Sequence, residues 1–166
     1  MIKVKREIDL YPDMCNWLET YLKDRYRGDD CSVFVVDCHS EYLDSILMKY
    51  NVVKYYPQVI GLKIEIDVLG IVIWKNSAKI FFIEAKKTQL NLQNLGQLLV
   101  YCLLCNPEEA FLLSSAGLGT LDNVLKNLGR EDLLKYAPGK SLKRIVVGKW
   151  DVSRKSVDHQ SIIPKI

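Results

Sequence analysis

Two apolar, β-branched runs separated by a short polar turn constrain the fold of this chain more than any other feature. Residues 61–74 and 79–86 are rich in Ile, Val and Phe, and the turn residues 75–78 lie between them. Runs of this kind on either side of a tight turn predict a β-hairpin. Because both faces of the hairpin are apolar, we expect it to lie in a sheet that is covered on both sides.

The hairpin is expected to bring three polar side chains together. If Asn76 and Ser77 form a two-residue turn, Asp67 lies directly opposite Lys86 in the antiparallel register. Glu84 is then the diagonal neighbour of Asp67 on the same face, within about 8 Å. The sequence therefore predicts that Asp67, Glu84 and Lys86 converge, although a slip of one residue would send Asp67 to the other face.

A pair of carboxylates at the end of a covered sheet favours a bound cation. Asp67 and Glu84 would repel each other, and burial would add the cost of lost hydration. Mg²⁺ prefers oxygen ligands and keeps several waters, so the pair and a backbone carbonyl would leave places for a phosphate oxygen and an attacking water. The alternative is a structural ion pair between Lys86 and one of the two acids, with no metal and no chemistry.

Helix and strand patterns fill the rest of the chain. They predict helices over residues 10–26, 40–50, 92–105 and 118–134, the second capped by Ser40, and further strands over residues 32–37, 52–59, 110–113 and 144–152. Pro57 confines the 52–59 strand to an edge or an end of the sheet. The alternation of strands and helices indicates one α/β domain over residues 1–166.

Composition narrows the function only slightly. The 166 residues are 49% hydrophobic and 26% charged, which is typical of a globular domain, and the net charge of +3 does not by itself indicate a nucleic-acid partner. The segment from Lys140 onward has a basic bias, which a solvated surface explains about as well. No apolar run is long enough to span a membrane and the first residues lack the apolar run of a signal peptide, so we expect a cytoplasmic protein.

The cysteines indicate neither a metal site nor a disulfide framework. Five cysteines occur in a chain without a secretory signal. Cys102 and Cys105 form a CxxC, but they share one face of an apolar helical run and are interpreted as small buried residues. Cys15, Cys31 and Cys38 lie far upstream, with no recognisable ligand spacing.

The hairpin residues also resemble a known signature. Asp67 on one strand, followed by Glu84-Ala85-Lys86 on the next, resembles the PD-(D/E)XK motif of the restriction-endonuclease-like nucleases, with Ile66 in place of the leading Pro. The resemblance implies a restriction-endonuclease-like α/β core, a central mixed β-sheet flanked by helices in the order αβββαβ. It also implies Mg²⁺ (or Mn²⁺) bound by Asp67, Glu84 and the carbonyl of Ala85, while Lys86 positions or activates the attacking water.

Two further features lie where this family would place them. Gln97 and Tyr101 are four residues apart on the helix after the hairpin, which resembles the QxxxY motif of RecB-like nucleases, although Tyr101 could also be a core residue. The family uses an acid near the first helix as a further metal or water ligand, and both Glu7 and Glu19 qualify. We favour Glu7, because residues 9–12 after it resemble the N-termini of several nuclease-like families, whereas Glu19 neighbours the apolar stripe.

One segment and two histidines lie outside the resemblance. The N-terminal strand and helix within residues 31–50 are extra relative to the minimal fold. The alternatives for this segment are a part in a DNA groove, a part in a dimer surface, or no part in function. His39, in this segment, is interpreted as a surface or capping residue, and His159, in a polar tail, in the same way.

Together these features predict a divalent-metal-dependent nuclease that hydrolyses phosphodiester bonds in DNA, an endonuclease acting as a homodimer. No small-molecule cofactor and no membrane partner is expected. One alternative is a catalytically inactive nuclease fold that binds DNA or protein. Another is an unrelated α/β interaction protein in which the hairpin acids are a coincidence. Carboxylates of Asp67 and Glu84 on opposite faces, or far apart, would exclude the nuclease and the inactive nuclease fold together.

Overall fold

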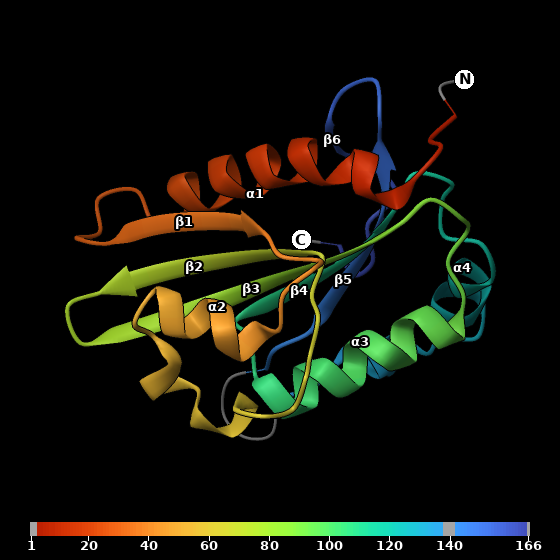
Figure 1. Ribbon diagram of the computed structural model, residues 1–166. Coiled ribbons are helices and arrows are strands. Elements are labelled where there is room, and N and C mark those ends of the chain that lie inside the picture. Colours follow the sequence, from red (N-terminus) through yellow and green to blue (C-terminus); the bar gives the residue numbers. More distant parts are fainter. Residues whose placement is uncertain (1–2, 138–141, 166) are drawn as a thin grey trace.

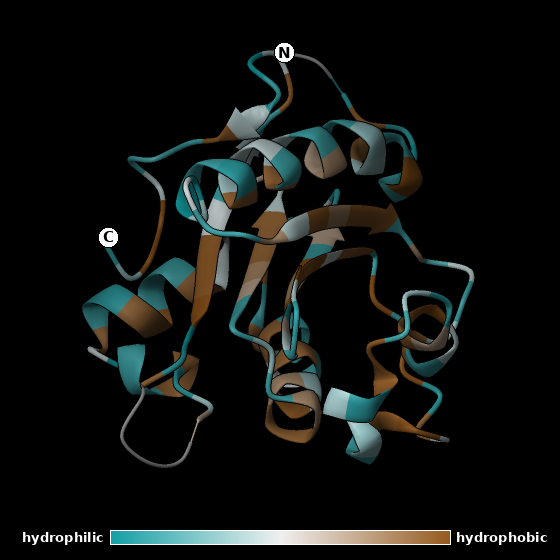
Figure 2. Ribbon diagram, turned by 90° about the vertical axis from the view of Figure 1, so that its left-hand side faces the viewer, coloured by the Kyte–Doolittle hydropathy of each residue, from teal (hydrophilic) through white to brown (hydrophobic). Residues whose placement is uncertain are grey.

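The computed structural model of the chain describes residues 3–137 and 142–165. They form an α/β fold in which a six-stranded mixed sheet lies between two helical layers (Figure 1). Helix α1 (Tyr11–Arg25) covers one face, and α2 (Leu43–Lys49) and α3 (Leu92–Cys105) lie on the other. In Figure 2 the strands are coloured largely as hydrophobic, and much of the hydrophilic colour lies on the helices. The predicted mixed sheet flanked by helices is confirmed.

The strands follow one another across the sheet in sequence order. They are β1 (Ser32–Asp37), β2 (Val68–Trp74), β3 (Ser77–Lys86), β4 (Glu109–Ser114), β5 (Ile145–Asp151) and β6 (Ser156–Val157). Strands β1, β2 and β3 are antiparallel, β3, β4 and β5 are parallel, and β6 is antiparallel to β5. Strands β1, β3, β4 and β5 therefore end at one edge of the sheet, and β2 begins there.

Short helical turns connect these elements. They are η1 (Glu7–Leu10), η2 (Val53–Tyr55), η3 (Pro57–Val59), α4 (Thr120–Asp122), η4 (Asn123–Asn127) and η5 (Glu131–Leu134). Helix α2 begins later than expected, because Tyr42 and not Ser40 occupies its N-cap position, without a side-chain hydrogen bond. Within the described ranges, every helix is too short or too polar to cross a membrane.

The face of α1 that meets the sheet follows the predicted stripe. Met14, Leu18 and Leu22 are fully buried at helical spacing. They belong to one apolar layer with residues of the sheet such as Val72. Pro12 lies in the first turn, where its missing backbone donor would have no partner in any case. The predicted first helix is confirmed.

The second apolar layer lies between the sheet and α3. Leu95, Leu98, Cys102 and Cys105 are the buried positions of this helix. Both cysteines are free thiols, and burial raises the pKa of Cys105 to about 12. Both side chains are fully buried within this apolar layer, so the interpretation of the CxxC as packing is confirmed.

The prediction of a strand over residues 52–59 is wrong. The segment forms the 3₁₀ turns η2 and η3, and Pro57, which has no backbone N–H for a strand ladder, begins the second. Strand β1 pairs with β2 and occupies the place in the sheet that the 52–59 strand was expected to fill. The prediction that residues 31–50 are extra relative to the minimal fold is wrong for β1, which is part of the central sheet. Helix α2 and the turns η2 and η3 are inserted between β1 and β2.

The helix expected over residues 118–134 is broken into α4, η4 and η5, and η4 has π geometry. Gly129 adopts a φ of +65°, the left-handed conformation that glycine tolerates and that commonly ends a helix. The spacing of Leu121, Val124, Leu125 and Leu128 predicts the buried stripe of this helix. Leu121 and Leu125 are buried and Val124 is half-buried, whereas Leu128 is 64% exposed. The apolar spacing was therefore informative, but the glycine prevents one continuous helix.

The hairpin forms as predicted, but its turn lies one residue earlier. Trp74 pairs with Ser77, so that Lys75 and Asn76 make the turn. Strand β2 begins only at Val68, and the residues before it in the expected strand are irregular. The pairing differs from the expected one by two residues, and an even shift leaves every side chain on its predicted face.

The close contact between α1 and the sheet gives a prediction on stability. A Cβ at Gly70 in β2 would lie 2.8 Å from Leu22 Cδ1 and 3.0 Å from Leu18 Cδ2. We expect Gly70→Ala to lower the free energy of unfolding by about 1–3 kcal/mol, measured by urea denaturation. Gly96→Ala is the control, since no atom lies within 4 Å of its Cβ position, and it should raise stability by up to about 1 kcal/mol. A Gly70→Ala protein as stable as the wild type would contradict the packing described.

Candidate active site

The two acids and the lysine predicted from the hairpin lie at the edge where β1 and β3 end. Asp67 directly precedes β2, and Glu84 and Lys86 lie at the end of β3. The pairing of Val68 with Ile83, continued by one residue, places Asp67 opposite Glu84 and not opposite Lys86 as expected. Asp67 is close enough to Glu84 to affect its pKa, so the two carboxylates are neighbours.

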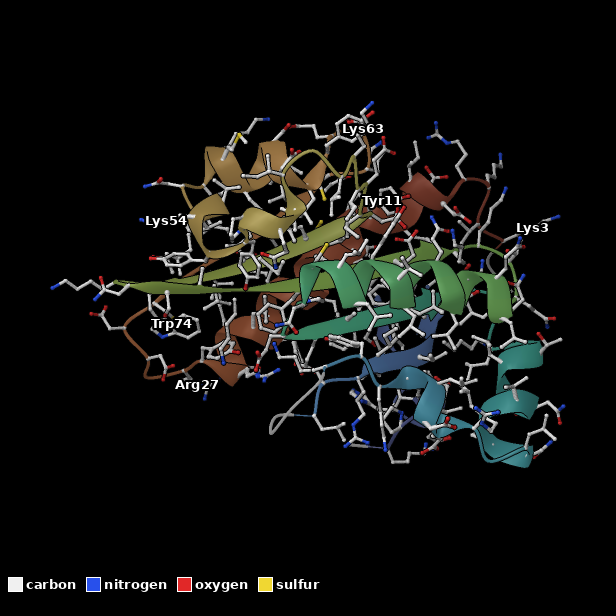
Figure 3. All side chains as sticks on the ribbon, turned by 90° about the horizontal axis from the view of Figure 1, so that it is seen from below. Lys3, Tyr11, Arg27, Lys54, Lys63 and Trp74 are labelled. Carbon is white, nitrogen blue, oxygen red and sulfur yellow. The ribbon has the colours of Figure 1, made fainter. Side chains whose placement is uncertain are left out.

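Asp67 is held by donors from two distant parts of the chain. The Tyr11 hydroxyl donates a hydrogen bond to its Oδ1 at 2.8 Å, and the backbone N–H of Ala85 donates to its Oδ2 at 2.8 Å. Its own carbonyl accepts from the backbone N–H of Cys38 at 3.1 Å. Figure 3 shows Tyr11, from the first turn of α1, between the α2 segment and α3 in a view from below. Asp67 is therefore fixed in place by α1, β3 and the end of β1.

Glu84 is the buried acid of the pair. It is 7% exposed, and its Oε2 has no hydrogen-bond partner within the described residues. Lys86 Nζ lies 3.7 Å from Glu84 Oε1, a distance for charge attraction and not for a tight hydrogen bond. Burial, and next the charge of Asp67, raise the pKa of Glu84 to about 8, while Lys86 opposes the shift. The ionised site thus holds more negative charge than Lys86 balances.

Of the two candidate N-terminal acids, Glu7 lies nearer the site. Its Oε2 accepts a hydrogen bond from the backbone N–H of Lys87 at 3.2 Å, directly after the end of β3. The charge of Glu7 also helps to raise the pKa of Tyr11, after the larger effects of burial and of Asp67. Glu19 lies along α1 and pairs with Lys23 at 3.2 Å on an exposed surface.

Gln97 and Tyr101 share one face of α3, as their spacing predicts. Gln97 Nε2 donates to the Tyr101 hydroxyl at 3.4 Å. Tyr101 packs against the apolar layer beneath α3. Within the described residues, no hydrogen bond joins either side chain to Asp67, Glu84 or Lys86. The structure places this pair on the helix that covers the same face of the sheet, without direct contact to the acids.

Sequence reasoning missed Tyr11 and the pair formed by Asp37 and His39. Tyr11 reads as one more member of the apolar stripe, and its bond to Asp67 spans 56 residues. His39 Nδ1 lies 2.5 Å from Asp37 Oδ1, and its ring centroid lies 5.2 Å from that of Tyr11. The only sequence signal was an Asp-x-His spacing at the end of a predicted strand.

The donor set fits a hard divalent cation that keeps some of its water. Within residues 3–137 and 142–165, no group of three or more His, Cys, Asp and Glu side chains is placed to hold a metal ion. Asp67 and Glu84 would contribute carboxylate oxygens, and Ala85 a backbone carbonyl. The buried, unpartnered Glu84 Oε2 is the observation that favours a cation, because a lone buried carboxylate oxygen is costly.

No protein-family model, curated protein or solved structure matches this chain. The geometry of the site and the resemblance of its residues to the nuclease signature are therefore the grounds for assigning a function.

The raised pKa of Glu84 predicts how stability depends on pH without metal. Its pKa is about 8 in the folded protein, against an ordinary value of 4.5. The folded state therefore binds the extra proton, and this contribution to stability is full below pH 4.5 and lost as the pH rises through 8. We expect the wild type to lose up to about 1.4 kcal/mol per pH unit across this window relative to Glu84→Gln.

Urea denaturation of both proteins at several pH values, in chelator, measures the difference. Titrating groups that do not interact with Glu84 cancel in the comparison, because the two proteins differ only at this residue. Parallel pH dependences would show that Glu84 is not buried beside an uncompensated charge.

Proposed function

We propose that this protein is a divalent-metal-dependent nuclease that hydrolyses phosphodiester bonds in DNA, at a site built on Asp67, Glu84 and Lys86. The observation that carries the proposal is the buried Glu84 carboxylate, with one unpartnered oxygen, next to Asp67. A structural ion pair would be expected to use the lysine to balance one acid. Here two neighbouring acids face one lysine, which lies 3.7 Å from Glu84.

The order of elements supports the same proposal. Helix α1 is followed by the antiparallel strands β1, β2 and β3, then by α3 and the parallel strand β4. This is the αβββαβ order that the resemblance to the PD-(D/E)XK nucleases implies. The candidate residues lie at the start of the second strand and the end of the third, as in that signature.

Each residue of the site would have a separate role in hydrolysis. Asp67, Glu84 and the Ala85 carbonyl would hold Mg²⁺ or Mn²⁺, which when bound polarises the phosphate and lowers the pKa of a bound water. Lys86, 19% exposed, would orient the attacking water and offset the charge that develops on the phosphate. Glu7 would hold the backbone after β3 through Lys87, or take a water of the metal.

Basic side chains near this edge suit a polyanionic substrate. Lys86 and Lys87 lie at the end of β3, Lys149 follows the same edge on β5, and Lys5 and Arg6 precede η1. Arg6 is 70% exposed and pairs with Asp9 at 2.9 Å. Such cations attract phosphates without reading sequence. They support DNA as substrate more than a small neutral molecule.

Plasmid cleavage tests the proposal. Purified protein is incubated with supercoiled and branched DNA in Mg²⁺, in Mn²⁺ and in chelator, beside Asp67→Asn, Glu84→Gln and Lys86→Met. We expect metal-dependent cutting, with losses of at least about 100-fold in each variant. Glu19→Gln is the matched control and should cut at the wild-type rate. Sedimentation of the same preparations with a short duplex would show whether two copies bind, as a homodimer requires.

Two outcomes would contradict the nuclease. Cutting that persists in Asp67→Asn or in chelator would place the activity elsewhere. No cutting by any form, together with metal-independent DNA binding, would favour a catalytically inactive binding module.

Tyr11 gives a second test, of the metal site itself. The hydroxyl that holds Asp67 is removed in Tyr11→Phe while the buried ring is kept. We expect the affinity for Mg²⁺, read from the metal dependence of the cleavage rate and from calorimetry, to fall about 10-fold to 100-fold. Tyr21→Phe is the control, because the Tyr21 hydroxyl bonds to Glu109 at the opposite edge of the sheet. Equal affinities in the two variants would show that Tyr11 does not position a metal ligand.

A further inference from the structure

An oriented imidazole lies beside the candidate site, at the end of β1. His39 Nδ1 is 2.5 Å from Asp37 Oδ1. An ionised carboxylate can only accept a hydrogen bond, so the proton of this contact lies on Nδ1. The other ring nitrogen, Nε2, is then the one that can meet a substrate. A carboxylate that accepts from Nδ1 fixes the ring, so that Nε2 is directed to exchange protons with a substrate.

The histidine is tied to Asp67 by two separate links. Its ring lies 5.2 Å from the Tyr11 ring, at 48°, and the Tyr11 hydroxyl bonds to Asp67 Oδ1 at 2.8 Å. Cys38, between Asp37 and His39, donates its backbone N–H to the Asp67 carbonyl at 3.1 Å. The Asp37 and His39 pair therefore has a fixed place relative to the carboxylates.

The strand order places this pair on the side of Asp67 away from Lys86. Across the edge, His39 follows β1, Asp67 precedes β2, and Lys86 ends β3. Neighbouring strands are about 4.8 Å apart, so the carboxylates lie between His39 and Lys86. Hydrolysis of a phosphodiester proceeds in line, with the entering and leaving oxygens on opposite sides of the phosphorus. With Lys86 at the entering water, His39 is on the side of the leaving oxygen.

The pair is also accessible to a substrate. The side chains of His39 and Asp37 are 39% and 40% exposed. The neighbouring Tyr11, by contrast, is 4% exposed, and its hydroxyl is committed to Asp67. Of this cluster, the His39 side chain can therefore contact a bound DNA strand.

We propose that His39, oriented by Asp37, donates a proton to the leaving oxygen in phosphodiester hydrolysis. This inference rests on the proposed nuclease function. Water oxygen forms the new bond to phosphorus, and the bond from phosphorus to the sugar oxygen breaks. The sugar oxygen takes the proton of His39 Nε2 as it leaves, and the histidine is reprotonated from solvent. The proton released by the water passes to solvent on the side of Lys86. Phosphodiester and water thus give a phosphomonoester and an alcohol.

The test compares an ordinary bond with one whose leaving group needs no proton. The cleaved position and the product ends are mapped on an oligonucleotide duplex with the wild type. The same duplex is then made with sulfur in place of the leaving oxygen at that bond, since a thiolate leaves unprotonated. His39→Gln should cut the ordinary duplex about 100-fold more slowly than the wild type, yet cut the sulfur duplex at nearly the wild-type rate. Asp37→Asn should show the same pattern with a smaller loss, because the ring loses its orientation.

Two control variants separate this role from a structural one. His159→Gln changes the other, exposed histidine and should match the wild type on both duplexes. Glu84→Gln should lose both activities. Equal slowing of His39→Gln on the two duplexes, or no slowing on the ordinary one, would overturn the role of His39 and leave the nuclease intact. A wild-type protein that cuts neither duplex would overturn the proposed function and this inference with it.

Discussion

Burial of β3 on both faces is the constraint on which the rest of the structure depends. Phe81 and Ile83 face the α1 layer, and Ile80 and Phe82 face the α3 layer, and all four are fully buried. Such a strand is stable only with a neighbour on each side and a helix over each face, and β2, β4, α1 and α3 meet that need. Alternation along the strand then carries Glu84 into the α3 side, where water is largely excluded.

The acids at the two ends of the sheet are balanced differently by neighbouring cations. At the start of β4, Glu108 and Glu109 are met by Arg25, Lys79 and Lys143, and the Tyr21 hydroxyl donates to Glu109. That cluster has more cations than acids and needs no further partner. At the other edge the balance is reversed, since Lys86 pairs with Glu84 at 3.7 Å and, within the described residues, Asp67 has no ion pair. The contrast within one molecule indicates that the second cluster is not simply a device for stability.

Much of the fold and part of the site could be predicted from local patterns. Two β-branched runs around a short turn located the hairpin, and its acids kept their face because the error in register was even. Helical spacing located α1 and α3. The errors fell where a single backbone property overrides apolar spacing, at Pro57 and at Gly129. Tyr11 and His39 could not be found in this way, because their place at the site depends on how β1 and α1 meet β2, and no local pattern encodes such a contact.

The Tyr11 hydroxyl also determines how the site responds to pH. Burial and the charge of Asp67 raise the pKa of its hydroxyl well above the ordinary value of 10. The hydroxyl therefore keeps its proton at every pH at which a protein of this kind is expected to work, and it remains a neutral donor. The direction in which Asp67 presents its free lone pairs is then independent of pH. A bound ion would therefore meet two different acids. Asp67 has a constant orientation, whereas Glu84 must first release its proton.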